Sequence, residues 1–450
     1  MAAHGGRLTK WSLGGAIGVL ALGLWLGADA AACECENMVQ LASQRSYGES
    51  APKSMEHDAA DWASAEAAHL TAHVQLTPDD MFLKAGEGYI SWNMKHMIFQ
   101  AVPQPEPGEE PDEFYTMYLA DLVWEDGLII GMTDFRRISP EGSANTCGWF
   151  DPNDENIVYF GTTLTAPTQE EAPGYSRNDD RYRWMFPPEM LVVKYDMREP
   201  AGERESLDIV VGNTTAYQAE ESLSPDGRHM VYSNLDTGDG DLYIYNMETG
   251  KAINVIDKPG YDGGPFFSPD GKRICYRSDR RGDNHLQLFV AELAFDEDGN
   301  VTGLEREYQL TNNGHVNWAP FWHPDGRHLV YATSEMGHRN YEVFIIDADS
   351  GNLDDSPGPV RYGTNQRRVT FAKGADVLPI FSPDGEWLTW TGQRGEAETS
   401  QLWAAKFVMP LDPYTGENAG GARRTTSVHQ DHSSHAGHIC EGPEHLADSE

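Results

Sequence analysis

Short apolar strands alternate with polar turns along most of the chain, and one turn sequence returns at intervals. In each copy an apolar side chain follows six residues after the first residue of the turn, and an aromatic side chain follows eight residues after it. A spacing of two places both side chains on one face of a β-strand. The turn reads Ser-Pro-Asp-Gly or His-Pro-Asp-Gly at residues 224–227, 268–271, 323–326 and 382–385.

The chemistry of this turn explains why two antiparallel strands meet there. Proline presets φ at the second position of a β-turn, aspartate suits the third, and glycine supplies the positive φ that follows. Looser copies begin at Ser91 and Asp151 and keep the register, which makes six copies. Residues 74–407 then hold about 56 residues per repeat, near the range of propeller blades. We expect an all-β fold, a six-bladed β-propeller of four-stranded antiparallel blades.

The repeated pattern Phe-Ser-Pro-Asp-Gly-(Lys/Arg)-x-apolar-x-Tyr, with a following segment such as residues 241–245, resembles the WD-like repeats of TolB-type six-bladed β-propellers. The resemblance implies an exported propeller with a scaffold role in the cell envelope. The same repeat class also serves propeller domains attached to peptidases and some carbohydrate-active enzymes, so the fold alone does not settle the function. The N-terminus departs from TolB because it shows no separate α/β domain, which puts an exact TolB role in doubt.

The two ends of the chain differ in character from the repeats. Residues 1–32 have basic residues, then an uncharged apolar run and small residues, the layout of a signal peptide; a retained membrane anchor and lipidation at Cys33 are the alternatives. Residues 33–73 form a polar leader in which residues 58–69 favour a short helix. Residues 408–450 form a Gly- and His-rich flexible tail. All three N-terminal interpretations predict a periplasmic or extracellular protein, with membrane contact only through an anchor or lipid.

The strongly acidic composition narrows the class of partners. The chain has 71 acidic and 33 basic residues, for a formal net charge of −38. Nucleic-acid binding depends on a basic surface, so we expect no nucleic-acid partner. Five cysteines are too few for a disulfide scaffold in a chain of 450 residues, and no obligatory disulfide is predicted.

The segment Val74–Thr77 predicts how the ring closes. It resembles residues 308–311, which lie just before the fifth repeat, whereas the sixth repeat has no evident outer strand after Phe407. We therefore expect Val74–Thr77 to supply the outer strand of the sixth blade, which would hide an otherwise open sheet edge.

Polar residues recur where the chain enters the first strand of each repeat, on the face opposite the Ser-Pro-Asp-Gly turns. We expect these loops to surround the mouth of the central channel, because the first strand of a blade is innermost and converging polar groups in a concavity are a default ligand site. The alternative is that these residues only cap strand ends and hold channel water. The candidate ligand- or partner-binding residues are Glu87, Asn145, Gln218, Glu220, Asp262, Asn317, Trp318 and Asp376.

Histidines offer a second kind of site. His285, His315 and His338 lie in loops of the fourth and fifth repeats, and the tail carries His429, His432, His435 and His438. Either group is a candidate for a divalent metal, although scattered loop histidines and a disordered polar tail are the plainer interpretations.

No nucleophile elbow, zinc-protease motif or P-loop is present. We therefore expect a monomeric, non-enzymatic propeller without a cofactor that binds a protein or small ligand. The alternative is a metal-dependent carbohydrate-active enzyme of the polysaccharide lyase type.

Overall fold

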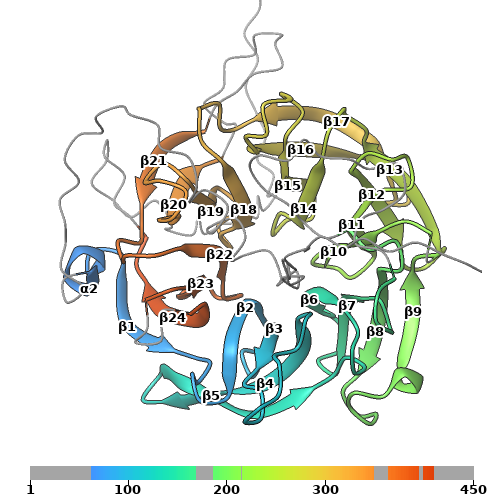
Figure 1. The fold of residues 1–450 in the computed structure, drawn as a ribbon. Coiled ribbons are helices and arrows are strands. Elements are labelled where there is room, and N and C mark those ends of the chain that lie inside the picture. The colour runs from blue at the N-terminus through green and yellow to red at the C-terminus, as the bar shows by residue number, and fades with distance from the viewer. Residues whose placement is uncertain (1–61, 169–185, 214, 349–362, 395–398, 410–450) are drawn as a thin grey trace, which may run out of the picture.

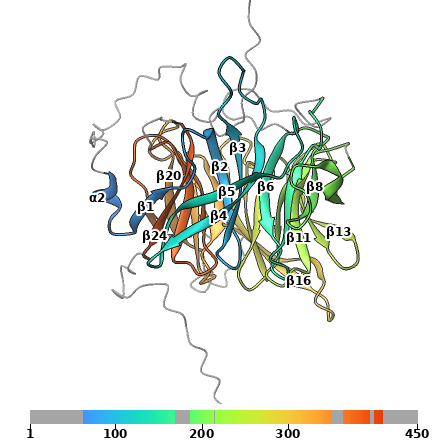
Figure 2. The ribbon, with the colours of Figure 1, turned by 90° about the horizontal axis from the view of Figure 1, so that it is seen from below.

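The computed structural model describes residues 62–168, 186–213, 215–348, 363–394 and 399–409. They form six four-stranded antiparallel sheets arranged in a ring (Figure 1), which confirms the expected propeller. Figure 2 shows the ring from its side, with the strands running between its two faces. We call the face with the Ser-Pro-Asp-Gly turns the turn face, and the opposite face, where the chain enters each innermost strand, the entry face.

The blades follow one another in sequence. Blade 1 contains β2 (Phe82–Ile90), β3 (His96–Pro103), β4 (Thr116–Glu125) and β5 (Leu128–Arg137). Blade 2 contains β6 (Asn145–Phe150), β7 (Ile157–Thr162), β8 (Leu191–Asp196) and β9 (Leu207–Val211), with a 3₁₀ turn at Arg204–Ser206. Blade 3 contains β10 (Gln218–Leu223), β11 (His229–Asn234), β12 (Asp241–Asn246) and β13 (Lys251–Ile256).

Blade 4 contains β14 (Asp262–Phe267), β15 (Arg273–Ser278), β16 (Gln287–Phe295) and β17 (Val301–Gln309). Blade 5 contains β18 (Asn317–Trp322), β19 (His328–Thr333), β20 (Glu342–Asp347) and β21 (Thr364–Arg368). Blade 6 contains β22 (Asp376–Phe381), β23 (Trp387–Gly392), β24 (Gln401–Phe407) and, from the start of the chain, β1 (Leu70–Gln75).

The repeated aromatic residue lies in the second strand of every blade and is buried. In blade 4, Tyr276 pairs across the sheet with Phe289, and their rings stack at 5.6 Å. Such cross-strand aromatic pairs stabilise a sheet beyond the area that they bury. The hydrophobic core is divided among the interfaces between neighbouring blades. The six aromatic residues are Phe99, Tyr159, Tyr232, Tyr276, Tyr331 and Trp390.

The repeated turn owes its shape to a short network of hydrogen bonds. In the turn of blade 4, Ser268 Oγ donates to Asp270 Oδ1, and the amide of Gly271 donates to the carbonyl of Ser268 at 2.8 Å. Gly271 has a φ of 69°, in the left-handed region that favours glycine. Its role is therefore structural.

The ring closes as the sequence predicted. Strand β1 pairs antiparallel with β24, from Leu70 opposite Phe407 to Gln75 opposite Trp403. The strand begins four residues earlier than expected. Thr77 follows it and donates to the Oε1 atom of Gln401 at 2.7 Å.

The helix α2 (Trp62–Glu66) lies against the outer side of blade 6 and locks this closure (Figures 1 and 2). The Glu66 carboxylate is fully buried and accepts hydrogen bonds from Arg394 Nη1 at 2.9 Å and from the Phe371 amide at 2.7 Å. The guanidinium of Arg394 also pairs with Asp376 and lies 4.5 Å from the Trp62 ring. The end of the expected polar leader is thus part of the propeller.

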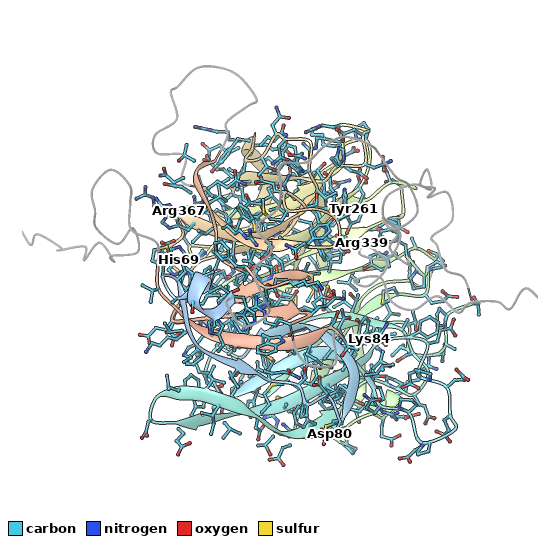
Figure 3. The ribbon with its side chains drawn as sticks, turned by 60° about the vertical axis from the view of Figure 1, so that its left-hand side comes forward. His69, Asp80, Lys84, Tyr261, Arg339 and Arg367 are labelled. Atoms are coloured by element: carbon cyan, nitrogen blue, oxygen red, sulfur yellow. The ribbon has the colours of Figure 1, made fainter. Side chains whose placement is uncertain are left out.

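Figure 3 shows the side chains of the described residues on the ribbon, with His69 beside the helix α2. Among the described residues, no helix combines the length and the hydropathy needed to cross a bilayer. The expected signal or anchor segment, most of the polar leader and nearly all of the tail lie outside the described residues. Cys147 and Cys275 are buried free thiols.

Candidate functional site

Every innermost strand carries a β-bulge at the same position, and the six bulges surround the channel. The register of each inner strand shifts at this point, and one residue per blade has a φ between 46° and 62°. Left-handed backbone is costly for residues other than glycine, by about 1–2 kcal/mol each, and bulges re-aim side chains. The six residues are Glu87, Cys147, Glu220, Gly264, Ala319 and Leu378.

All six bulge residues line a central cavity that opens on the entry face. The cavity has a volume of about 110 Å³. Its wall is polar on the side of blades 1 to 4, where Glu87, Glu220 and Glu221 gather, and apolar on the side of blades 5 and 6. The site is therefore a small space that opens on the entry face, with an acidic half and an apolar half.

Glu220 is held rigidly by donors from three strands and two loops. Tyr261 Oη donates to both of its carboxylate oxygens, at 2.5 and 2.6 Å, and the Gly264 amide donates to Oε2 at 2.6 Å. Ser233 Oγ donates to the same oxygen at 2.9 Å, and Arg277 Nη2 lies 3.3 Å from Oε1. The Tyr217 hydroxyl donates to Oε1 at 3.4 Å, and five donors around one buried carboxylate leave it little capacity to bind anything else.

Glu87 is more weakly held. Its oxygens receive the Tyr89 hydroxyl at 3.2 Å, the Cys147 thiol at 3.2 Å and the Cys147 amide at 3.4 Å. Burial raises the pKa of Glu87 above its ordinary value, and the nearby charge of Glu220 adds to this effect. Burial also raises the pKa of the Cys147 thiol well above its usual range, so this cysteine is no activated nucleophile.

Glu221 follows the bulge and also lines the cavity, with 2% of its surface exposed. Burial raises its pKa well above the ordinary value. Neither carboxyl oxygen is hydrogen-bonded to another described residue. Among the acidic side chains of the cavity lining, only Glu221 has two oxygens that are not hydrogen-bonded to another described residue.

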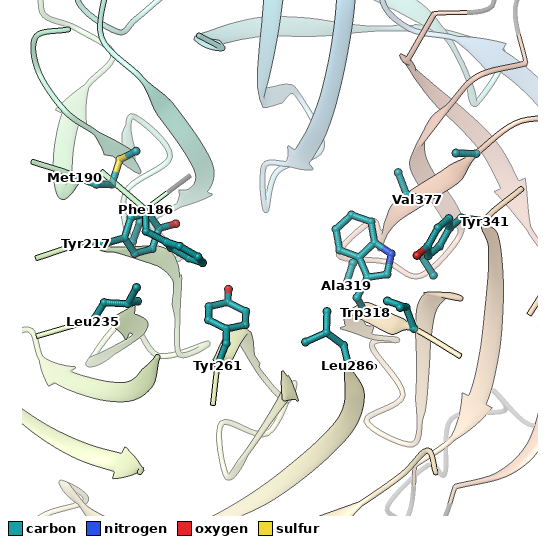
Figure 4. Packing of buried hydrophobic residues seen from close by; sticks show 14 of the residues in the cluster. Phe186, Met190, Tyr217, Leu235, Tyr261, Leu286, Trp318, Ala319, Tyr341 and Val377 are labelled. Atoms are coloured by element: carbon teal, nitrogen blue, oxygen red, sulfur yellow. The ribbon is translucent and has the colours of Figure 1, made fainter. Parts of the chain in front are cut away.

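Aromatic side chains form the rim and the apolar half. Figure 4 shows Phe186, Tyr217 and Tyr261 on one side of the central space, with Trp318 and Ala319 facing them. The rings of Phe186 and Tyr217 meet edge to face at 5.0 Å. Leu378, Pro379 and Ile380 complete the apolar wall.

A collar of aromatic rings closes the channel below the cavity. Tyr89 of blade 1 reaches Phe266 of blade 4, with centroids 5.9 Å apart, and Trp149 of blade 2 reaches Phe321 of blade 5 at 6.2 Å. Beyond this collar lies a second, apolar depression on the turn face, lined by Trp92 and by prolines of the four Ser/His-Pro-Asp-Gly turns. The two faces therefore offer chemically different surfaces.

The structure brings half of the expected binding residues to the cavity. Glu87, Asn145, Glu220 and Trp318 line it. Asn145 also caps a strand end, because its Nδ2 donates to the Tyr115 carbonyl at 2.8 Å.

The other four expected residues are buried away from the cavity and are bonded within the protein. Gln218 donates to Asp236 Oδ2 at 3.2 Å, and Asp262 pairs with Arg280 Nη2 at 2.9 Å. Asn317 donates to Asn313 Oδ1 at 2.8 Å, and Asp376 pairs with Arg394. Side chains alternate along a strand, so the neighbours of these residues face the channel instead, as Tyr217 and Trp318 do.

The structure does not gather His285, His315 and His338. His285 Nδ1 lies 3.5 Å from Asp283 Oδ2, and His338 Nδ1 lies 3.2 Å from the Tyr341 hydroxyl. Among the residues that the structure describes, no group of three His, Cys, Asp or Glu side chains is arranged to hold a metal ion. The four tail histidines, His429, His432, His435 and His438, lie outside the described residues.

Sequence reasoning missed most of the cavity lining, including the polar or ionisable residues Gln100, Cys147, Tyr217, Glu221 and Arg277. A bulge lets two consecutive residues, Glu220 and Glu221, face the same space, which breaks the period of two on which the prediction relied. The adjacent pair of glutamates in an inner strand was the available signal.

Sequence comparison finds relatives of the blades. No protein-family model matches the chain. The Tol-Pal system protein TolB of Francisella tularensis subsp. holarctica, in strains OSU18 and LVS, is 29% identical over 223 residues. The match covers 40% of this chain and 51% of that protein, so the chain spans about half the length of the curated relatives it matches.

Solved structures with similar folds include TolB from Acinetobacter baumannii and an oligogalacturonate lyase from Vibrio parahaemolyticus. The first is 16% identical with a TM-score of 0.43, covering 70% of this chain and 64% of that one. The second is 12% identical with a TM-score of 0.38, covering 76% and 93%. Likenesses of this size carry no argument about activity. The chain is therefore a six-bladed β-propeller that is similar in sequence to part of TolB.

Proposed function

We propose that this protein is an exported, non-enzymatic binding propeller with a TolB-like scaffold role in the cell envelope, and that it holds a protein or small-ligand partner at the entry face. The observation that carries the proposal is the central cavity, to which all six blades contribute a bulge residue. Concave sites that combine apolar walls with a few converging polar groups are typical of ligand binding. The sequence match to TolB supports the envelope role.

The metal-dependent lyase hypothesis is not carried forward. It depended on three loop histidines that the structure does not bring together. No other observation favours it.

The test is to obstruct the entry face without touching the turn face. Ala144 lines the cavity near its mouth, so Ala144→Phe should fill part of the opening, and Thr146→Phe provides a second obstruction. Thr302→Phe is the matched control, because Thr302 lies exposed on the outer strand of blade 4. Trp92→Ala alters the turn-face depression.

The assay is affinity capture from an envelope fraction, followed by quantification of the captured partner, with melting temperature confirming that each variant is folded. We expect both cavity variants to lose the partner, and the Thr302 and Trp92 variants to keep it. Capture that survives both obstructions, or that only the Trp92 change abolishes, would place the site on the other face and overturn the proposal.

A further inference from the structure

Glu221 is the acidic side chain of the cavity that is buried without a hydrogen bond to another described residue. Its carboxyl group is nine-tenths or more buried, lines the cavity and is hydrogen-bonded to no other described residue. A buried carboxyl group without a partner destabilises the folded state. Its neighbour Glu220 shows that this region can satisfy a carboxylate completely, with five donors. The cost at Glu221 is therefore one that a ligand can relieve.

The net negative charge of the cavity lining favours a cationic ligand. The lining holds three carboxyl groups, those of Glu87, Glu220 and Glu221, and one guanidinium, that of Arg277. The guanidinium is already committed to Glu220 and to the Tyr261 hydroxyl, at 3.3 and 2.9 Å. The charge of Arg277 also lowers the pKa of Glu87, but Arg277 forms an ion pair with neither Glu87 nor Glu221.

The polar atoms that line the cavity favour an ammonium group over a metal ion. Gln100 Oε1 also lines the cavity, is buried and accepts no hydrogen bond from a described residue. An ammonium group has three donors and no acceptor, which suits a carboxylate and an amide oxygen together. No group of three His, Cys, Asp or Glu side chains within the described ranges is arranged around a metal ion.

The apolar half suits the stem that carries such a group. Leu378, Pro379 and Ile380 form one wall, and Trp318 forms another. A lysine side chain places a compact ammonium at the end of four methylene groups that pack on apolar surface. The cavity volume of about 110 Å³ accommodates the end of one side chain rather than a folded segment.

We propose that the central cavity receives a primary ammonium group on an aliphatic stem, such as a lysine side chain of a partner protein, and that Glu221 is the carboxylate that binds it. This inference rests on the proposed function, since it names the chemistry that the same entry-face site recognises.

The titration of the cavity gives the inference a pH signature. Burial raises the pKa values of Glu87 and Glu221, and the neighbouring carboxyl groups raise them further. An entering ammonium stabilises the ionised carboxylate, so its binding releases protons and strengthens as pH rises, up to the pKa of the amine. The titratable and charged groups that share the cavity and its rim are Glu87, Tyr89, Tyr115, Cys147, Tyr217, Glu220, Glu221, Tyr261 and Arg277, and Lys84 Nζ lies 5.0 Å from the Tyr115 ring.

The experiment uses defined probes on the full chain. Nα-acetyl-lysine methylamide is titrated at millimolar concentrations by ligand-observed NMR at pH 6 and pH 8, beside its neutral analogue Nα-acetyl-norleucine methylamide and calcium chloride. The lysine probe should bind, at least several-fold more tightly at pH 8, and the norleucine probe should not.

Glu221→Gln should weaken the lysine probe at least tenfold, because it removes the charge and keeps the shape. The same variant should melt no lower than the wild type, because a costly buried carboxyl group is gone. Asp262→Asn is the matched control: it alters a buried aspartate outside the cavity and should bind the probe like wild type.

Equal binding of lysine and norleucine probes, or unchanged lysine binding by Glu221→Gln, would overturn the inference, and a response to calcium alone would assign the site to a metal. The proposed function has its own readout. If Ala144→Phe abolishes partner capture while Glu221→Gln and free lysine probe leave it intact, the entry-face site stands and the ammonium chemistry fails.

Discussion

Removing the Glu66 carboxylate should loosen the closure of the propeller more than any change of similar size on its surface. This carboxylate is fully buried and binds Arg394, His73 and the amide of Phe371. In Glu66→Ala, the guanidinium of Arg394 stays buried with Asp376 as its remaining anionic partner. Breaking a buried, hydrogen-bonded ion pair by removing one partner costs about 3–5 kcal/mol.

The expected shift in melting temperature follows from the size of the domain. A change of 1 kcal/mol shifts Tm by about 2–4 °C in domains of about 150–250 residues, and this propeller is larger. At about 2 °C per kcal/mol, Glu66→Ala should lower Tm by about 6–10 °C. Glu66→Gln should lower it less, because the amide oxygen can still accept from Phe371.

Calorimetry or circular dichroism of the purified chain provides the measurement, and Glu386→Ala is the control. Glu386 lies in the same blade, 3.6 Å from Lys406, with both side chains largely exposed. Exposed pairs contribute about 0–1 kcal/mol. Deleting residues 1–78, which removes α2 and β1 together, should cost at least as much as Glu66→Ala. A Glu66→Ala melt within 1 °C of wild type, or no lower than that of the control, would refute the view that this helix locks the ring.

Three further outcomes follow from the same structure. Burial would raise the pKa of Glu66, but His73 and Arg394 outweigh this effect and hold the pKa below 4.5. The stability that the carboxylate contributes is present above pH 4.5 and is lost as pH falls through the lowered pKa. The difference in Tm between wild type and Glu66→Gln should therefore shrink in an acid titration. Gly264→Ala should destabilise the fold more than Gly271→Ala, and equal denaturation midpoints would contradict this prediction. Both glycines have positive φ, so each substitution costs about 1 kcal/mol in backbone strain. Only at Gly264 would the new Cβ clash with Arg277 Nη1 and displace the guanidinium from Glu220. Phe266→Ala, in the collar that closes the channel, should cost about 2–4 kcal/mol by urea unfolding, whereas Phe295→Ala, at an exposed ring, should stay within about 1 kcal/mol.

The repeats revealed the architecture because each copy combines a turn of defined chemistry with apolar residues two positions apart. Tyr276 and Trp390 could be placed in buried second strands on that basis alone, and Val74 could be assigned to the closing blade. These inferences depend on local spacing, which a sequence displays directly.

The cavity was harder to predict because its geometry departs from that spacing. The bulge at Glu220 turns Glu221 toward the channel. Asp262 and Asp376, which were expected at the channel mouth because they lie where the chain enters an inner strand, face arginines inside the protein. Arg277 enters the site from a second strand, opposite Gly263. Contacts between distant segments decide which acidic residue lacks a hydrogen-bond partner. Local spacing in the sequence does not predict these contacts.

The pairing of β1 with β24 has a consequence for how the chain reaches its native state. Thr77 contacts Leu402 across 325 positions of sequence, so the first strand of the described residues is paired only by the last strand of the described residues. Until then β1 and the growing array of blades each present an unpaired strand edge, which is prone to pair with other chains. A product truncated anywhere before Phe407 cannot close and keeps both edges open. Proteolysis or aggregation during biosynthesis should therefore discriminate sharply between chains that end before β24 and chains that contain it, although they differ by a single strand.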